Sequence, residues 1–242
     1  MASALNPRQL MGLDDSHLVP LPDGHRLQEE VAQAFAALEG AARQSGYELV
    51  IASSFRPFSR QLAIWNGKVD GSHPVHDDEG RAVLMARLSP QEKLHAILRF
   101  SAIPGTSRHH WGTDLDVYDA AVMPSDYRLQ LSPQEVAAGG LFDPLHCWLD
   151  ERMAAGESYG FYRPYDNDRG GVAPERWHLS YAPLSVDCAQ QCDRTLLAAD
   201  CWSGDEMAQE LLLREEIDAS FEDIMERYVR VPRNWCPPPR TE

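Results

Sequence analysis

The segment of residues 104–118, PGTSRHHWGTDLDVY, decides the expected fold and the expected site. Its opening Pro-Gly is a turn signal, and residues 113–118 alternate between polar and apolar side chains as a half-buried strand does. In such a strand Leu115 and Val117 point to one face, while Asp114 and Asp116 point to the other. We therefore expect a strand that buries its apolar face and presents two carboxylates on the opposite face.

A histidine, His109, precedes this strand by a few residues. Gly112 lies between them and can adopt backbone conformations that allow a sharp turn, so that His109 and Asp116 can converge. An imidazole and a carboxylate brought together in this way are two of the three protein ligands of a catalytic zinc site, which keeps one position for water. The neighbouring His110 is expected to line the cleft or to support the site rather than to bind a metal.

A third ligand is expected from a second alternating segment, residues 176–182, RWHLSYA. There Leu179 and Tyr181 share one face, and His178 lies on the polar face of a probable strand. Glu175 lies at the mouth of that strand, close enough to contact a metal-bound water without being a ligand itself.

The two segments carry motifs that resemble a known family. Residues 107–116, SRHHWGTDLD, followed by residues 175–178, ERWH, resemble the paired signature of the VanY-type D-alanyl-D-alanine carboxypeptidases. These zinc peptidases belong to a superfamily that includes VanX-type dipeptidases, phage endolysins and the hedgehog signalling domain. The resemblance extends over roughly residues 25–183.

This resemblance implies a set of roles for particular residues. One Zn²⁺ per chain would be bound by His109, Asp116 and His178, and Glu175 would be the catalytic base. Ser107 would bind substrate through its hydroxyl.

A further family motif, Gly-Tyr-Arg-Ser followed by Gln, is echoed by residues 54–57, SFRP, and by Gln61. The resemblance implies that Arg56 binds the substrate and stabilises the oxyanion, and that Ser54 and Gln61 make further contacts with the substrate.

The sequence departs from the family pattern at two positions. Asp114 stands where the family usually has Ala, and Pro57 stands where it usually has Ser. Asp114 adds a negative charge beside the expected ligands, so it could orient His110 or contact a cationic group of the substrate. Both departures concern the choice of substrate rather than the metal.

Composition narrows the class of protein. The 242 residues carry 22 Lys and Arg against 37 Asp and Glu, a net charge of −15, which argues against nucleic acid and anionic membranes as partners. No segment reads as a secretory signal or a spanning helix. Five cysteines at irregular spacings favour free thiols and a cytoplasmic location, although Cys188, Cys192 and Cys201 could bind a second metal if a fourth ligand existed.

The fold class expected is α+β: a small antiparallel sheet that carries the zinc site, flanked by helices. Residues 1–183 would form the carboxypeptidase domain with an N-terminal arm, and residues 184–242 a helical extension with a Pro-rich tail. Apolar periodicity and start signals predict the other elements. These are a strand over residues 47–52 and helices over residues 25–44, 58–66, 81–88, 89–100, 143–153 and 207–228, with a short helix from Ser132.

The predicted helix over residues 207–228 carries one apolar stripe, formed by Ile217, Phe221, Ile224 and Tyr228. A stripe of this kind indicates packing on the same domain, with a homodimer contact as the alternative.

The expected substrates are stem peptides of peptidoglycan (muropeptides), from which VanY-type enzymes remove a C-terminal D-alanine. Without an export signal, an L,D-carboxypeptidase that trims tetrapeptides in murein recycling is favoured over a D,D-carboxypeptidase acting on D-Ala-D-Ala pentapeptides. Two further alternatives remain: a phage-type endopeptidase, and a non-enzymatic hedgehog-like domain that binds zinc and a partner.

Overall fold

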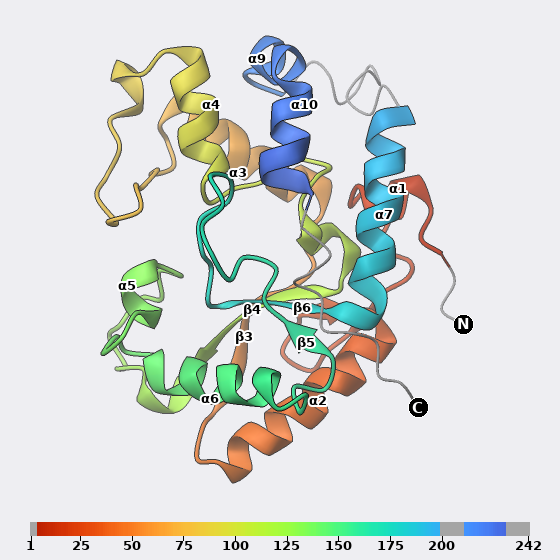
Figure 1. Ribbon diagram of the computed structural model, residues 1–242, viewed down its shortest axis with the longest axis vertical. Coiled ribbons are helices and arrows are strands. Elements are labelled where there is room, and N and C mark those ends of the chain that lie inside the picture. Colours follow the sequence, from red (N-terminus) through yellow and green to blue (C-terminus); the bar gives the residue numbers. More distant parts are fainter. Residues whose placement is uncertain (1–3, 199–210, 231–242) are drawn as a thin grey trace.

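Four strands form a central antiparallel sheet in the order β3-β4-β6-β5 in the computed structural model, which describes residues 4–198 and 211–230 (Figure 1). The strands are β3 (Leu49–Ser53), β4 (Asp114–Asp119), β5 (Phe161–Tyr162) and β6 (His178–Tyr181). A separate two-stranded sheet pairs β1 (Val19–Pro20) with β2 (Arg26–Leu27). The expected α+β class with a small antiparallel sheet is confirmed.

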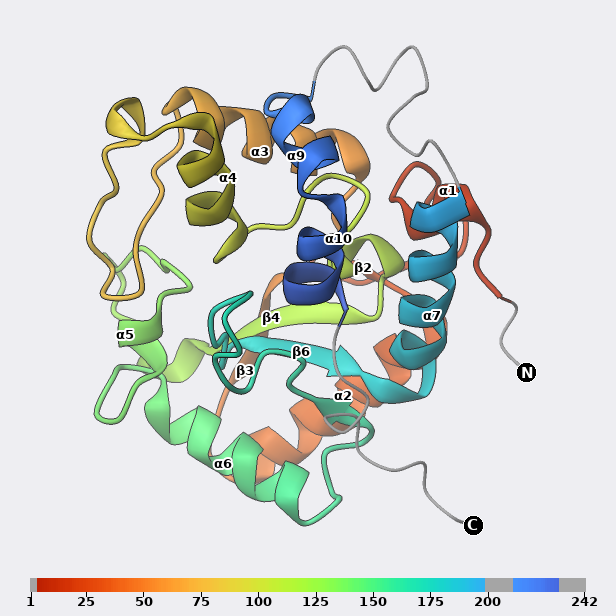
Figure 2. The same cartoon turned by 45° about the horizontal axis from the view of Figure 1, so that its top comes forward.

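Helices cover both faces of the central sheet, as Figures 1 and 2 show from two directions. Helices α2 and α6 lie on one face, and α3, α4, α9 and α10 lie beyond the other. The helices are α1 (Pro7–Leu10), α2 (Glu29–Gln44), α3 (Phe58–Asp70), α4 (Pro90–Leu98), α5 (Pro133–Val136), α6 (Asp143–Ala154), α7 (Ala182–Ala198), α9 (Arg214–Ala219) and α10 (Phe221–Ile224). Short turns of other helix types are η1 (Met85–Arg87), η2 (Arg108–Trp111), η3 (Ala120–Val122) and η4 (Met225–Val229).

The alternation of β4 divides the molecule into an apolar and a polar side. Leu115 and Val117 are buried in one hydrophobic cluster with residues of α2 and α6, and Leu179 and Tyr181 of β6 join them. Because side chains alternate along a strand, Asp114 and Asp116 of β4 and His178 of β6 face the opposite side, toward the layer that contains α3 and α4. The polar face of the sheet is therefore the floor of the candidate site.

The described C-terminal residues 211–230 pack on this second helical layer. Ile217, Ile224 and Tyr228 are buried in one cluster with residues of α3 and α4, and Phe221 packs against its edge. The indole of Trp65 donates a hydrogen bond to the backbone oxygen of Leu212 (2.9 Å). The apolar stripe thus packs within its own chain, while the division into residues 1–183 and 184–242 stays a prediction.

Four expected helices differ from the observed ones, and one of them, α3, simply extends to Asp70 rather than ending at residue 66. Of the other three, the first begins at Glu29 rather than at residue 25, because residues 26–27 pair with β1 instead. Of the expected helix over 81–88 only η1 forms, since His76 and Ala82 form an isolated β-bridge just before it. The described part of the expected helix over 207–228 is broken near Ser220 into α9 and α10, and residues 207–210 lie outside the described residues.

One long helix, α7, continues directly from β6 into the predicted helical extension, although no helix with these bounds was predicted. None of the described helices is both long enough and apolar enough to cross a bilayer. Cys147 and Cys188 are free thiols, while Cys201 and Cys236 lie outside the described residues.

Candidate metal centre

Strand pairing alone brings two of the expected ligands together. In the antiparallel register of β4 and β6, Asp116 lies directly opposite His178. Directly opposed residues on one face of such a pair have neighbouring side chains. The alternating pattern of both strands therefore places a carboxylate and an imidazole side by side.

His109 arrives from η2, a 3₁₀ turn that precedes β4. The backbone N–H of Arg56 donates to the backbone oxygen of His109 (3.1 Å), which anchors the turn beside β3. Gly112 ends the turn with φ +69°, and a Cβ there would lie 2.3 Å from a methyl carbon of Leu18. Only glycine fits both the backbone conformation and the space, so the sharp turn expected between His109 and the strand is present.

The three residues form a buried cluster of potential ligand atoms. His109 Nε2 lies 3.3 Å from Asp116 Oδ2, and His178 Nδ1 lies 3.2 Å from Asp116 Oδ1. One ligand atom from each residue falls within 4.8 Å of the others, and no other such group occurs in residues 4–198 and 211–230. The structure thus brings together the set that the sequence predicted.

The far nitrogen of each imidazole is fixed by a hydrogen bond outside the cluster. His109 Nδ1 donates to the backbone oxygen of Ser54 (2.9 Å), and His178 Nε2 donates to Asp114 Oδ1 (3.0 Å). Metal-binding histidines commonly have such an outer partner, which selects the tautomer and orients the ring. His109 Nε2 and His178 Nδ1 are thereby left to face Asp116.

The donor set fits a divalent cation such as zinc. Asp116 Oδ1 is buried and has no hydrogen-bond partner among the described residues, although His178 Nδ1 is near it. A buried carboxylate oxygen needs a partner, and two imidazole nitrogens with one carboxylate form a recognised three-ligand zinc set. Burial opposes protonation of His178, but its hydrogen bond to Asp114 and the nearby negative charge of Asp116 outweigh burial and raise the pKa of His178 to about 9. A cation would compete with that proton.

Asp114 occupies a different place from the one expected. Its carboxylate is completely buried and accepts hydrogen bonds from Arg108 Nε (2.7 Å) and from the hydroxyl of Thr113 (2.6 Å), besides that of His178. Burial opposes its ionisation, but the Arg108 guanidinium and His178 outweigh burial and lower the pKa of Asp114 to about 2. Asp114 does not line the pocket, so its position does not match the expected contact with the substrate.

Nor does Asp114 orient His110. Both ring nitrogens of His110 have other partners: Nδ1 donates to the backbone oxygen of Arg56 (2.6 Å), and Nε2 accepts from the N–H of Gly105 (3.1 Å). Burial lowers the pKa of His110 to about 3. His110 is thus a neutral, buried histidine that ties the turn around η2 together.

Arg108 was missed by sequence reasoning. Its guanidinium is buried, bonds Asp114, and also donates to the hydroxyls of Tyr162 (3.0 Å) and Ser180 (2.7 Å). Arg108 therefore supplies the positive charge that keeps the carboxylate of Asp114, the partner of His178, ionised. Its place beside His109 in the sequence was the only available signal.

Glu175 lies at the edge of the cluster, as expected. Its Oε2 is 3.7 Å from His178 Nδ1, and its N–H donates to the backbone oxygen of Tyr165 (2.9 Å). Burial raises the pKa of the Glu175 carboxyl to about 7. A carboxyl with such a pKa can both accept and donate a proton near neutral pH.

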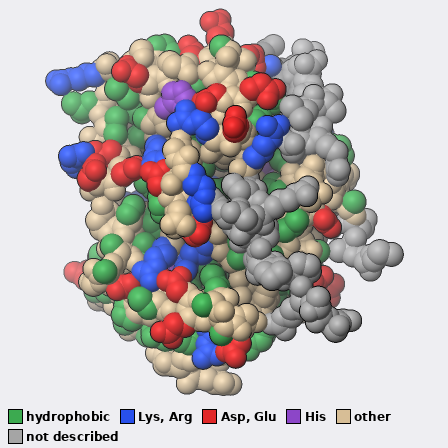
Figure 3. All heavy atoms as spheres, in the orientation of Figure 1, with side chains coloured by type: hydrophobic (Ala, Val, Ile, Leu, Met, Phe, Trp, Pro, Cys, Tyr) green, Lys and Arg blue, Asp and Glu red, His purple; other side chains and the backbone are tan. Residues whose placement is uncertain are grey.

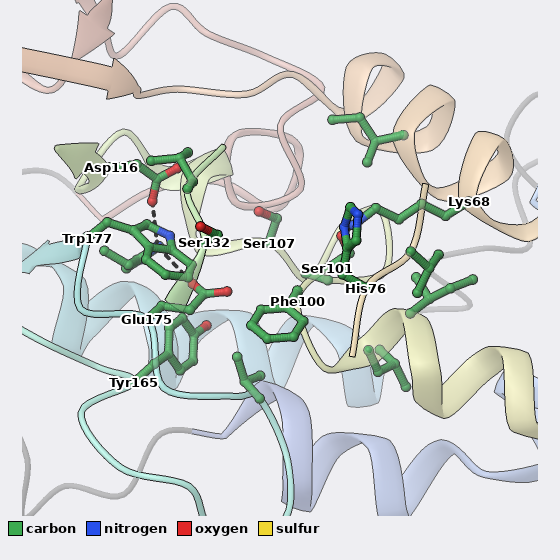
Figure 4. Close-up of a pocket in the computed structure, with 18 of the residues that line it drawn as sticks. Lys68, His76, Phe100, Ser101, Ser107, Asp116, Ser132, Tyr165, Glu175 and Trp177 are labelled. Carbon is green, nitrogen blue, oxygen red and sulfur yellow. Dashed lines mark hydrogen bonds and ion pairs between the residues drawn. The ribbon is translucent and has the colours of Figure 1, made fainter. Parts of the chain in front are cut away.

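A pocket of about 440 Å³ opens from the cluster (Figure 4). The pocket is lined by the three residues of the metal cluster and by Glu175, Arg56 and Ser107. Trp177 and Tyr165, which the sequence did not single out as site residues, line it as well. The Tyr165 ring contacts His178 at a centroid distance of 5.1 Å. Beyond them the pocket continues to Lys68, His76 and Ser101.

Two expected substrate contacts lie behind the pocket wall. Gln61 is fully buried, accepts a hydrogen bond from Arg56 Nη1 (2.9 Å) and donates to the backbone oxygen of Ala102 (2.7 Å). The Ser54 hydroxyl is bonded to His25 (3.0 Å). Gln61 thus positions Arg56, and neither Gln61 nor Ser54 lines the pocket.

On the face shown in Figure 3, Lys and Arg side chains are interspersed with Asp and Glu side chains, and many of them are paired. Arg99, for example, bonds both Asp78 and Asp168. This face therefore offers no extended acidic surface to a basic partner.

Comparison with known proteins gives consistent matches. The sequence model of the VanY family, described as D-alanyl-D-alanine carboxypeptidase, matches residues 24–184. An uncharacterized protein of Haemophilus influenzae is 46% identical over 103 residues, covering 41% of this chain and 70% of that protein. A D-alanyl-D-alanine carboxypeptidase of Enterococcus faecalis is 25% identical over 175 residues, covering 71% of this chain and 54% of that one.

Among solved structures, a variant of the vancomycin-resistance D,D-pentapeptidase VanY in complex with Zn(II) is 24% identical, with a TM-score of 0.48. The match covers 74% of this chain and 88% of the other. Since the family model spans well over half of the sequence and includes every residue of the metal cluster, this chain belongs to the VanY D-alanyl-D-alanine carboxypeptidase family.

Proposed function

We propose that this protein is a zinc-dependent carboxypeptidase that removes a C-terminal D-alanine from peptidoglycan stem peptides. One observation carries the proposal: a buried two-histidine, one-aspartate cluster lies beside a carboxyl group whose pKa is raised, at the floor of a pocket. A domain that only binds zinc and a partner would need the cluster but would not need a carboxyl group with a raised pKa.

In this proposal His109, Asp116 and His178 bind one Zn²⁺, which supplies a Lewis acid for the scissile carbonyl and the attacking water. Glu175 accepts the proton of that water and later donates it to the leaving amine, because its pKa of about 7 allows both transfers. Arg56 faces the pocket with its guanidinium fixed by Gln61 and by Ser53 (3.1 Å), and stabilises the developing oxyanion. The Ser107 hydroxyl lines the same pocket and binds the terminal carboxylate.

The proposed substrate is a tetrapeptide, cleaved at the L,D bond between a diamino acid and the terminal D-alanine. The pocket supports this choice, since its 440 Å³ extend well past the cluster and exceed what an alanyl side chain would fill. A long diamino-acid side chain next to the scissile bond would use that space, whereas a D,D-cleaved pentapeptide places alanine there. The free thiols of Cys147 and Cys188 support a reducing compartment, in keeping with the proposed role in cytoplasmic murein recycling.

The test is to incubate the purified, zinc-loaded protein with defined tetrapeptide and pentapeptide and to identify products by mass spectrometry. We expect D-alanine from the tetrapeptide, with Glu175→Gln as the inactive control. Release from the pentapeptide alone would instead assign the D,D activity. Stoichiometric zinc with no release from either peptide would contradict the enzymatic proposal and support a binding domain.

A further inference from the structure

A lysine, Lys68, lies in the pocket, away from the metal cluster. Lys68 extends from α3 toward Ser101 and His76, while Asp116 and Glu175 lie at the other end of the pocket, with Ser107 between the two groups (Figure 4). Arg56 and Arg108 also line the pocket, but Arg56 is held by Gln61 and Arg108 forms an ion pair with Asp114.

The ammonium of Lys68 is short of partners. Its single hydrogen bond in the described part of the chain goes to the Ser101 hydroxyl (2.5 Å), and no carboxylate there forms an ion pair with it. Asp77 lines the same pocket, but Arg81 Nε (2.7 Å) and the backbone N–H groups of Glu79 and Arg81 occupy its carboxylate. Two of the three donors of Lys68 are therefore unused.

Ser101 adds a third unused donor. Its oxygen accepts from Lys68, and among the described residues its hydroxyl hydrogen has no acceptor. Burial lowers the pKa of Lys68 to about 8, which reflects the cost of holding a charge here without a counter-ion. A simpler interpretation is that Lys68 only connects α3 to the segment after α4. That interpretation leaves the cost uncompensated, since the connection is one hydrogen bond to a neutral hydroxyl.

A carboxylate matches this arrangement in charge and in geometry. It has two oxygens and accepts only, so one oxygen can take the ammonium donors and the other the hydroxyl hydrogen. The pocket joins Lys68 to the metal cluster without interruption, so a peptide held at the cluster can reach both.

We infer that Lys68 and Ser101 form an anion subsite that binds a carboxylate of the peptide substrate at the end of the pocket remote from the metal cluster. The inference rests on the proposed function. Stem peptides offer two kinds of carboxylate: the C-terminal one, and an internal one on the diamino acid or on the glutamate before it. The subsite would make the enzyme distinguish free from amidated peptides.

The experiment measures peptide binding by titration calorimetry in the zinc-loaded Glu175→Gln background, where substrate is not consumed. Three tetrapeptides are compared: one with all carboxylates free, one with a C-terminal amide, and one with the internal carboxylates amidated. We expect Lys68→Met to weaken binding of the free peptide about 10- to 100-fold, as for loss of a charge-assisted hydrogen bond. Amidation of the carboxylate that Lys68 contacts should weaken binding equally, and should have no further effect in Lys68→Met.

The pattern of the amidated peptides identifies the carboxylate. If only the C-terminal amide loses its effect in Lys68→Met, Lys68 binds the terminus; if only the internal amide does, Lys68 binds the internal group. Binding by Lys68→Met equal to that of the parent, or a loss that is the same for all three peptides, would overturn the subsite.

Two variants serve as controls. Lys68→Arg keeps the charge and should retain most of the affinity. Lys93, the only other lysine of the chain, lies on α4 outside the pocket lining, so Lys93→Met should bind as the parent does. Failure of the proposed function gives a different result from failure of the subsite, because the unsubstituted enzyme would then release no D-alanine.

Discussion

The two ends of the pocket differ in how many of their polar atoms have a hydrogen-bond partner. At the metal end nearly every polar atom has a partner: His109 is fixed by Ser54, His178 by Asp114, and Asp114 in turn by Arg108. At the Lys68 end one ammonium has one hydrogen bond, to Ser101. The metal end is thus organised before any ligand arrives, whereas the other end lacks a partner that a substrate can supply.

Removing a ligand should destroy the organised end altogether. We expect His178→Ala to lose both zinc and activity, because Asp116 and His109 alone leave too few ligands for a stable site. Metal content by plasma emission spectrometry and D-alanine release check both results. Wild-type protein stripped with a chelator should recover its activity on addition of zinc, and His178→Ala should not. Zinc retained at one equivalent by His178→Ala would show that the ion is bound elsewhere.

Glu175→Gln should separate chemistry from metal binding. The substitution preserves size but removes the base, so kcat should fall by about 100- to 10,000-fold. Zinc content should stay at one equivalent, because Glu175 lies at the edge of the cluster rather than within it. A kcat close to that of the unsubstituted enzyme would remove Glu175 from the mechanism.

Asp114 offers a test of how much the outer layer of the metal end matters. Asp114→Ala deprives His178 Nε2 of its acceptor, and we expect zinc affinity to fall about 10- to 100-fold, as for other outer partners of metal-bound histidines. It also leaves the buried guanidinium of Arg108 without its counter-ion, which should cost about 3–5 kcal/mol of unfolding free energy.

The two effects of Asp114→Ala can be measured apart. Denaturant unfolding of the metal-free protein gives the stability, and competition with a zinc indicator gives the affinity. The double variant Asp114→Ala/Arg108→Met should regain stability by removing the unpaired charge, but should keep the weak zinc affinity. Full recovery of zinc affinity in the double variant would mean that Asp114 acts only through the fold.

The metal end was predictable from sequence because its geometry is largely local. A strand alternates with a period of two, so the positions of Asp116 and His178 on their strands already placed both side chains on a polar face. The single long-range step, that His178 joins His109 and Asp116, came from the resemblance to the family, and the pairing of the strands was not predicted. His109 needed only the short turn that Gly112 permits.

Features that depend on distant contacts were not predictable in this way. Asp114 shares a face with Asp116, yet Arg108 folds back from η2 and covers it, and no pattern in the sequence encodes that direction. Lys68 falls just after the helix predicted over residues 58–66 and reads as an ordinary charged residue, whereas α3 extends to Asp70 and places its ammonium against Ser101. The N-terminal limit of α2 shifted for the same reason, since the pairing of β2 with β1 competes with local helix propensity.

The smallest expected effect concerns pH at the Lys68 end. Because burial places the pKa of Lys68 near 8, its ammonium is charged below that pH and loses its proton as the pH rises through it. Peptide affinity in the Glu175→Gln background should therefore be constant near pH 7 and fall by up to about tenfold per unit above pH 8. Nearby charges modify the midpoint: Glu175 raises the pKa of Lys68 and Arg56 lowers it, so the Glu175→Gln background shifts the midpoint slightly downward.

Lys68→Arg makes this pH test specific. A guanidinium stays protonated throughout the range, so the variant should show a flat affinity profile between pH 7 and 9. His76 and Asp77 also line this end of the pocket, but both are present in the parent and in the variant and would contribute equally to the two profiles. A decline in affinity that persists unchanged in Lys68→Arg would assign the titration to another group and remove the charge of Lys68 from peptide recognition.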